Sequence, residues 1–148
     1  MSNFAGHATA GFVASSVYAG SLFYVKSKWN LSVDDIVIPS MLMFVFSLFP
    51  DIDIKSTPSK IFYTIILGAL IYLYINGLYQ LGNLIAILAI IPQIVSHRGI
   101  FHSPFTALVL PSCVFYLKYI GEIDLKLAIL VYIGSVIGYC IHITLDRI

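Results

Sequence analysis

The charged side chains and the histidines lie at or near the ends of long apolar segments, and this arrangement leaves few folds open to the chain. Apolar residues make up 59% of the 148 residues and charged residues 10%, against roughly a quarter charged in soluble domains. Such a chain cannot cover a water-facing surface with polar groups. We therefore predict an integral, multi-pass protein of the cell membrane. Its apolar segments are 4–25, 36–49, 60–75, 81–95, 104–120 and 125–145.

Helix signals stand at the boundaries of these segments. Residues 32–35 (Ser-Val-Asp-Asp) resemble a capping box. Thr57-Pro58-Ser59 and Ser103-Pro104 place a cap residue and a proline where a helix would begin, and Asp124 is a further N-cap. We predict one all-α domain over residues 1–148, a bundle of about six short transmembrane helices. Several segments have about 14–16 residues, whereas about 20 span a typical hydrocarbon core, so some helices would be tilted or partly re-entrant.

The first segment is predicted to be a retained helix. Residues 1–6 lack the basic start of a signal peptide, and the helix carries a histidine that cleavage would discard. Small residues at helical spacing, Gly6, Ala10 and Ala14, would permit close packing against a neighbouring helix.

The number of crossings decides where the ionisable groups meet. The turn signal Asn76-Gly77 splits residues 61–91 into two helices, which gives six crossings. The N-terminus, the 51–59 loop, the 97–103 loop and the C-terminus then share one membrane face. Ionisable groups in or beside a bilayer are costly without partners, and a five-crossing chain would divide the set between two faces. We therefore favour six.

The ends of the chain contribute three candidate ligands. His142 and Asp146 are four residues apart on a predicted helix, so they project from one face about one turn apart. That spacing suits ligands of one metal or of two adjacent metals, and it equally suits a simple hydrogen-bonded pair. His7 lies near the start of the first helix, where a lone histidine is usually an interfacial residue. Its significance comes from sharing a face with the other candidates.

The two central loops contribute the remaining candidates. Asp51 and Asp53 follow a helix-ending proline, where they would either bridge metals or form a solvated turn. His97 and His102 bracket a glycine-containing turn and would converge on one site. Arg98 between them would hold a phosphoryl or carboxylate oxygen, or extend to lipid phosphates. Imidazole and carboxylate are ligands of divalent transition metals.

The charge balance and the cysteines exclude other classes. The formal net charge is +1, and there is no Lys/Arg cluster of the kind that binds phosphate backbones, so no nucleic-acid partner is expected. Cys113 and Cys140 both lie inside apolar segments, which favours buried free thiols over a disulfide framework.

Several blocks resemble the YdjM-type membrane-bound metal-dependent hydrolases, and they span nearly the whole chain in the expected order. His7 with Gly11 matches the N-terminal His-x-x-x-Gly of that family. The other blocks are Phe49 to Asp53 (Phe-Pro-Asp-Ile-Asp), Ser96 to Ser103 (Ser-His-Arg-Gly-Ile-Phe-His-Ser) and Gly138 to Asp146 (Gly-Tyr-Cys-Ile-His-Ile-Thr-Leu-Asp).

The resemblance implies a hydrolase distantly similar to zinc-dependent phospholipases C, acting on a phosphoester of a lipid or membrane-associated substrate. Two divalent metals, zinc or alternatively manganese, would activate a water, with Asp51 or Asp53 as general base and Arg98 on the phosphate. The first alternative is a structural zinc in a subunit of a larger complex or a homo-oligomer, and the second is a metal or proton transporter. The implied metal ligands are His7, Asp51, Asp53, His97, His102, His142 and Asp146.

Overall fold

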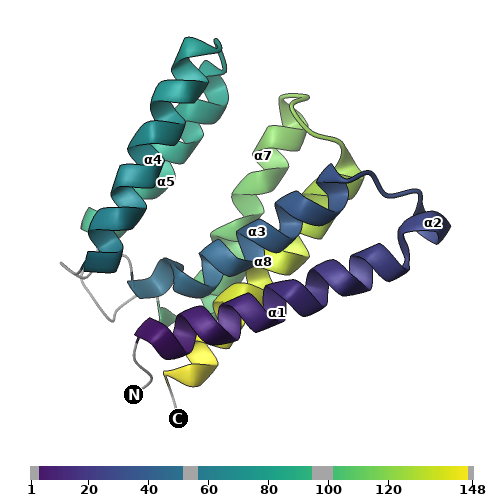
Figure 1. Cartoon of the computed structure of the whole chain (residues 1–148). Helices are drawn as coiled ribbons and strands as arrows, with labels where there is room; N and C mark the ends of the chain where they lie inside the picture. The colour runs from purple at the N-terminus through teal and green to yellow at the C-terminus, as the bar shows by residue number, and fades with distance from the viewer. Residues whose placement is uncertain (1–3, 52–56, 95–101, 147–148) are drawn as a thin grey trace. The chain divides into compact units, whose positions relative to one another are not determined.

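The computed structural model describes residues 4–51, 57–94 and 102–146, and every regular element in those ranges is helical (Figure 1). The all-α prediction is therefore confirmed for this part of the chain. Each of the six apolar segments contains helix. The elements are α1 (Phe4–Tyr24), α2 (Lys26–Trp29), α3 (Asp34–Leu48), η1 (Phe49–Asp51), α4 (Thr57–Ile75), α5 (Tyr79–Ile94), α6 (Pro104–Val109), η3 (Pro111–Cys113), α7 (Val114–Tyr119) and α8 (Leu125–Leu145).

The chain forms two compact units. The first comprises Met1–Pro50 and Ser103–Ile148, and the second comprises Asp51–His102. The second unit is thus an insertion between α3 and α6 of the first.

Three long helices, α1, α3 and α8, make the core of the first unit. α3 and α8 run in the same direction, because residues spaced by four along α3 meet residues spaced by four along α8 in the same order. α1 runs against both, since Tyr18 donates to the Leu130 carbonyl near the start of α8 while His7 reaches the end of that helix. The matching pairs of α3 and α8 are Pro39 with Gly134, Met43 with Gly138, and Ser47 with His142.

Glycines allow these helices to approach closely. A Cβ atom at Gly138 would lie 2.1 Å from the Met43 carbonyl oxygen, and one at Gly11 would lie 1.9 Å from the Ser47 hydroxyl. Neither position tolerates a side chain without moving backbone or neighbouring groups. Such contacts between small residues are typical of packed membrane helices.

The packing face of α1 lies one residue away from the predicted face. The structure buries His7, Gly11 and Ser15, whereas the predicted stripe of Gly6, Ala10 and Ala14 is half-buried. Both stripes consist mainly of small residues, so residue size alone does not predict which of them faces the neighbouring helices. The observed face is the one that buries the His7 imidazole.

The predicted caps at residues 32–35, Ser103 and Asp124 are confirmed, whereas Thr57 is the first residue of α4 and not the cap before it. The Ser32 amide donates to the Asp35 carboxylate over 2.8 Å, and the Asp35 amide donates to the Ser32 hydroxyl over 3.1 Å, which completes a reciprocal capping box. The Ser103 hydroxyl accepts from the Phe105 amide, and the Asp124 carboxylate accepts from the Leu127 amide. These side chains satisfy amide groups that a helix start leaves without intrahelical partners.

The fifth apolar segment is not one continuous helix. It divides into α6, the short 3-10 turn η3 and α7, with Pro111 at the first position of η3. Proline has no amide hydrogen and its ring displaces the preceding turn. The single helix that we expected from Ser103 to Ile120 is therefore interrupted at this residue.

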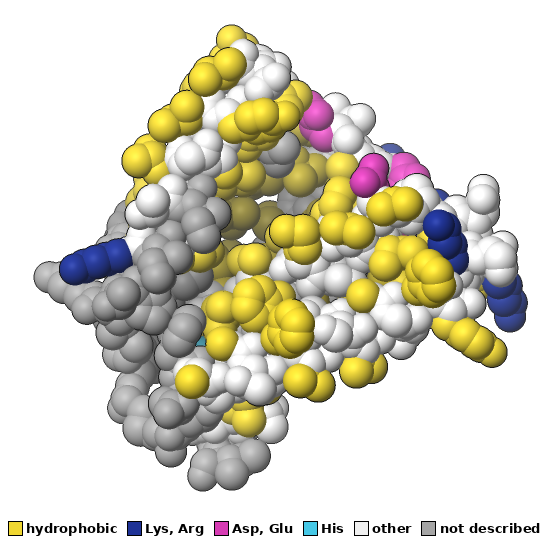
Figure 2. Space-filling model, in the orientation of Figure 1, with side chains coloured by type: hydrophobic (Ala, Val, Ile, Leu, Met, Phe, Trp, Pro, Cys, Tyr) yellow, Lys and Arg dark blue, Asp and Glu magenta, His cyan; other side chains and the backbone are white. Residues whose placement is uncertain are grey.

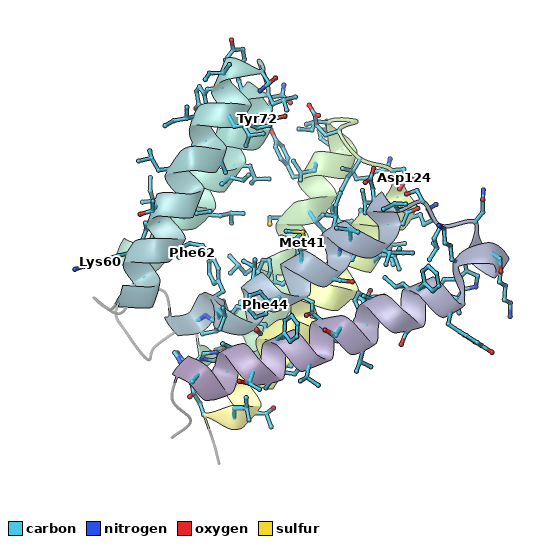
Figure 3. All side chains as sticks on the ribbon, in the orientation of Figure 1. Met41, Phe44, Lys60, Phe62, Tyr72 and Asp124 are labelled. Carbon is cyan, nitrogen blue, oxygen red and sulfur yellow. The ribbon has the colours of Figure 1, made fainter. Side chains whose placement is uncertain are left out.

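The second unit is built on a hairpin of α4 and α5. The predicted break at Asn76-Gly77 is confirmed, because α4 ends at Ile75 and Gly77 adopts a φ of 75°, which favours glycine. The Tyr74 hydroxyl donates to the Asn83 side chain across the turn. Figure 3 shows Lys60 near the beginning of α4 and Tyr72 near its end.

Apolar side chains are exposed along the surface of both units. Figure 2 shows yellow side chains over the helices, and on the face drawn the acidic and basic side chains of the first unit lie toward the end that bears α2. Among the described residues, α8 alone combines at least 18 residues with the hydropathy of a membrane span, at a mean hydropathy of 1.9. Phe62–Ile75 within α4 is a shorter apolar helix.

Candidate metal centre

Three of the predicted ligands come together in the first unit. His7 lies in the first turn of α1, His142 lies in the last turn of α8, and Asp146 is the C-cap residue of α8. One ligand atom from each can be chosen so that all lie within 4.8 Å of one another. The first and last helices of the chain thus bring together residues 139 positions apart.

The Asp146 carboxylate contacts both imidazoles. Its Oδ1 lies 3.1 Å from Nε2 of His7, and its Oδ2 lies 3.2 Å from Nε2 of His142. The two rings stack at a centroid distance of 4.0 Å and an angle of 17°. His7 and His142 are 1% and 0% exposed, whereas the Asp146 side chain is 21% exposed. The cluster therefore opens toward its surroundings only on the carboxylate side.

A backbone carbonyl fixes the tautomer of His142. Nδ1 lies 2.8 Å from the Ser47 carbonyl oxygen, which can only accept, so Nδ1 carries a proton and donates it. In a neutral ring Nε2 then has a lone pair directed at the Asp146 carboxylate, and two acceptors face each other. A proton or a cation between them relieves that repulsion. This carbonyl–histidine–ligand arrangement is how proteins orient metal-binding imidazoles.

The donor set fits a divalent transition metal. Two histidine nitrogens and a carboxylate are three protein ligands, the number found in catalytic zinc sites. With bonds of about 2.0–2.1 Å, two tetrahedral ligands lie about 3.3 Å apart. The 3.1 and 3.2 Å separations between the nitrogens and the carboxylate oxygens are close to that spacing.

The glycine contacts position this cluster. Gly11 is one turn after His7 and lets α1 approach Ser47, whose carbonyl accepts from His142. Gly138 is one turn before His142 and lets α8 approach the same stretch of α3. In Figure 3, Phe44 lies between α3 and α1, and its ring is 3.5 Å from the Cβ position of Gly11. The family pattern His-x-x-x-Gly thus has a packing reason.

Sequence reasoning missed Ser47 and the role of Gly138. A carbonyl acceptor carries no residue-type signal, so nothing in the sequence marks Ser47. The spacing Gly134-x-x-x-Gly138-x-x-x-His142 was readable as a close-packing stripe leading to the ligand.

The other predicted ligands belong to the second unit. Asp51 ends η1, and His102 is half-buried directly before the cap residue of α6. Asp53, His97 and Arg98 lie outside the described residues. The three-residue cluster of His7, His142 and Asp146 is contained in the first unit.

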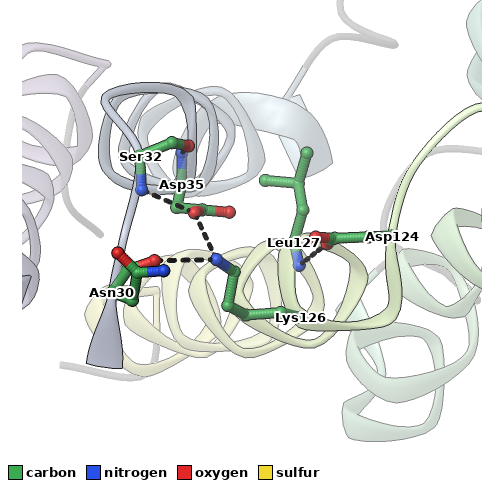
Figure 4. Close-up of polar contacts among 6 residues, drawn as sticks. All are labelled: Asn30, Ser32, Asp35, Asp124, Lys126 and Leu127. Atoms are coloured by element: carbon green, nitrogen blue, oxygen red, sulfur yellow. Dashed lines mark hydrogen bonds and ion pairs between the residues drawn. The ribbon is translucent and has the colours of Figure 1, made fainter. Parts of the chain in front are cut away.

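A second polar cluster lies at the other end of the α3–α8 pair (Figure 4). The Lys126 ammonium lies 2.8 Å from the Asp35 carboxylate and donates to the Asn30 carbonyl over 3.2 Å. Asn30 adopts a left-handed backbone conformation with a φ of 48°, which asparagine tolerates. Burial alone would raise the pKa of Asp35, but hydrogen bonds from Lys126 and Ser32 outweigh it, so that pKa lies below its ordinary value. We expected Asp35 only as a cap.

Comparison with known protein families identifies one that covers the chain. The whole chain, residues 1–148, matches the description of the YdjM inner membrane protein family. The chain belongs to that family. The predicted YdjM resemblance is therefore confirmed, and membership makes this a membrane protein. In this YdjM member, the block from Gly138 to Asp146 supplies both the close helix contact and two of the clustered ligands. Searches of curated proteins and of solved structures gave no match.

Proposed function

We propose that this YdjM-family protein is a metal-dependent hydrolase that acts at one membrane face on a phosphoester of a lipid or membrane-associated substrate. The proposal rests on the convergence of three residues of metal-binding type, His7, His142 and Asp146, whose ligand atoms lie within 4.8 Å of one another. The Ser47 carbonyl holds the His142 ring so that Nε2 faces the Asp146 carboxylate. The phosphoester specificity comes from the family resemblance.

The residues of the first unit would have two different roles in the proposed site. His7, His142 and Asp146 would hold the cation, while Ser47 keeps the His142 lone pair directed at it. A bound divalent cation would make a water more acidic and stabilise negative charge on phosphoryl oxygens.

The roles proposed for the residues of the two central loops come from the family resemblance. Asp51 and Asp53, with His97 and His102, would provide a second metal position, as the family blocks imply. One of the two aspartates would accept a proton from the attacking water. Arg98 would hold a phosphate oxygen bidentately.

The direction of the helices supports six crossings. α3 and α8 are parallel, and α1 is antiparallel to both. If α3 and α8 both cross the membrane, an odd number of passes separates them. α4, α5 and the α6–α7 segment provide three. The ends of α1 and α8 that bear His7 and Asp146 would then lie together at one membrane face.

Metal analysis and hydrolysis by the purified protein test the proposal. We expect about two equivalents of zinc or manganese per chain and hydrolysis of a phosphodiester headgroup in mixed micelles, lost on chelation and restored by metal. Asp51→Ala should remove metal, whereas Arg98→Ala should lower turnover and leave metal content unchanged. A metal-free preparation that keeps both fold and turnover would refute the proposal, and metal loss in Arg98→Ala would place Arg98 among the groups that support the ligands.

The near-complete burial of both imidazoles supports one alternative, a structural zinc in a subunit of a larger membrane complex. The two functions differ in coordination. A structural site has four protein ligands, whereas a catalytic site keeps a position for water or substrate. X-ray absorption spectroscopy of the zinc-loaded protein distinguishes them, because a site without an oxygen ligand from water favours the structural role.

A further inference from the structure

An apolar groove lies at the α2 end of the first unit, far from the metal centre. Its volume is about 630 Å³, and its walls are Trp29 and Leu31 from the segment after α1 together with Leu125, Lys126, Ile129 and Leu130 from α8. That volume falls within the roughly 300–1,000 Å³ of sites for small organic molecules. α8 has 21 residues, so its two ends are about 30 Å apart. The groove and the metal centre therefore lie toward opposite ends of α8.

The only cationic side chain in the wall contributes its aliphatic stem. The Lys126 ammonium is directed to Asp35 and the Asn30 carbonyl, as Figure 4 shows. Leu125 and Ile129 are 53% and 42% exposed on α8, one turn apart. The groove thus offers an acyl chain a continuous apolar surface along a helix that has the hydropathy of a membrane span.

Charge and aromatic character at the groove's rim suit a lipid head group. α2 carries Lys26 and Lys28 beside Trp29, which is 54% exposed. Tryptophan and lysine are characteristic of the membrane–water interface. Because Lys126 neutralises Asp35, the remaining charges of segment 26–35 are these two lysines against Asp34 alone. α2 itself thus carries two positive charges and no acid, directly beside Trp29 of the groove wall.

We propose that this groove, lined by Trp29 and α8, binds one anionic membrane lipid. The acyl chain lies along Leu125 and Ile129, and the phosphate head group lies beside Lys26 and Lys28. The site is independent of hydrolysis at the metal centre, because it lies at the other end of α8. It would anchor α2 to the membrane surface.

Trp29 is the only tryptophan in the chain, so its fluorescence reports on this groove alone. The full chain is reconstituted in nanodiscs of phosphatidylcholine that contain either brominated phosphatidylglycerol or brominated phosphatidylcholine with identical acyl chains. We expect brominated phosphatidylglycerol to quench Trp29 at a mole fraction about twenty-fivefold lower than brominated phosphatidylcholine, because each of the two lysines contributes about fivefold. Lys26→Gln with Lys28→Gln should abolish that preference, and Lys118→Gln, which removes a lysine from α7, should retain it.

A groove variant separates head-group attraction from chain binding. Ile129→Phe narrows the groove without adding a second tryptophan and should reduce quenching by both brominated lipids while Trp29 keeps its emission maximum. Equal quenching by the two lipids would overturn the anionic preference. A preference that survives loss of both lysines would overturn the head-group assignment. Protection from both lipids would show that protein, for example a second copy of the chain, covers the groove, and would overturn the proposal.

Discussion

The two ends of the parallel α3–α8 pair solve the problem of buried polar groups in different ways. At the α2 end, Asp35 and Lys126 are opposite charges 2.8 Å apart, and the remaining donors reach Ser32 and Asn30. At the other end, two imidazoles and one carboxylate gather against the Ser47 carbonyl. The first cluster joins opposite charges. The second gathers three candidate metal ligands within 4.8 Å of one another.

The two clusters therefore differ in composition, one an ion pair with a helix cap and the other a group of candidate metal ligands. Ionisable groups inside a membrane protein are functional by default, yet the Asp35–Lys126 pair is explained by a cap and an ion pair. The His7–His142–Asp146 cluster gathers three groups of the types that bind divalent metals, with ligand atoms within 4.8 Å of one another. We therefore expect substitutions at the His142 end to lower metal affinity, and substitutions at the Asp35–Lys126 end to lower the free energy of unfolding without changing metal content.

The largest expected effect is at the metal end. His142→Ala removes a ligand and the ring that stacks on His7, and it should lower metal affinity by more than about 100-fold, beyond the 10–100-fold range for groups that merely support ligands. Thr144→Ala is the matched control, because its exposed hydroxyl bonds only within α8. Metal content after gel filtration measures both. Full occupancy in His142→Ala would remove this histidine from the site.

The next effect acts through helix approach. Gly138→Ala places a Cβ against the Met43 carbonyl, separates α8 from α3 and weakens the Ser47–His142 hydrogen bond. We expect about tenfold lower metal affinity and a loss of about 1–3 kcal/mol in the free energy of unfolding from overpacking. Gly20→Ala is the control, since nothing lies within 4 Å of its Cβ position. Equal metal affinity in both variants would show that the close contact between α3 and α8 at Gly138 is not required for metal binding.

The sequence predicted the helices well because their signals are local. The Ser103, Asp124 and 32–35 caps, and the break at Asn76-Gly77, depend on residues a few positions apart, and the structure confirms each. The signal for the interruption at Pro111 is also local, since it is the proline itself. The interruption was not predicted because the apolar segment continues on both sides of this proline.

The site was predictable in its ligands and not in their support. His7, His142 and Asp146 were recognised by type, spacing and shared membrane face, and the structure brings them together. Every residue has a backbone carbonyl, so residue type does not mark the one at Ser47. The packing face of α1 is shifted by one residue from the predicted stripe, and that shift depends on which face contacts α3 and α8. Both follow from tertiary packing. The contribution of Asp51, Asp53, His97, Arg98 and His102 stays a prediction.

A smaller effect is expected at the other end of the pair. Lys126→Leu leaves the buried Asp35 carboxylate with the Ser32 amide as a donor but without its cation. It should lower the free energy of unfolding by about 1–3 kcal/mol, the penalty for a buried group that loses its partner. Asp35→Leu combined with Lys126→Leu should recover part of that loss. Thermal unfolding in detergent measures stability. Metal content should not change, and metal loss would contradict the separation of the two ends.

The pH dependence of the same pair has a definite sign. The pKa of Asp35, which precedes the apolar segment starting at Ile36, is lowered in the folded protein. Its contribution to stability is therefore present above the unfolded pKa of about 3.9 and is lost as pH falls through the folded value. The stability difference between the native protein and Lys126→Leu should shrink at pH below about 4. A difference that stays constant into acid would show that the ion pair does not stabilise the fold.

The smallest expected effect isolates the cap from the ion pair. Ser32→Ala removes the hydroxyl that accepts from the Asp35 amide but keeps the Ser32 amide, which donates to the carboxylate. Only one half of the capping box is lost, so stability should fall by about 1 kcal/mol and the Lys126 contact should persist. Ser103→Ala removes the equivalent hydroxyl at α6 and gives the reference value for a cap without an ion pair. If Ser32→Ala costs as much as Lys126→Leu, the hydroxyl is required to orient the carboxylate, and the α2 end is one cooperative cluster.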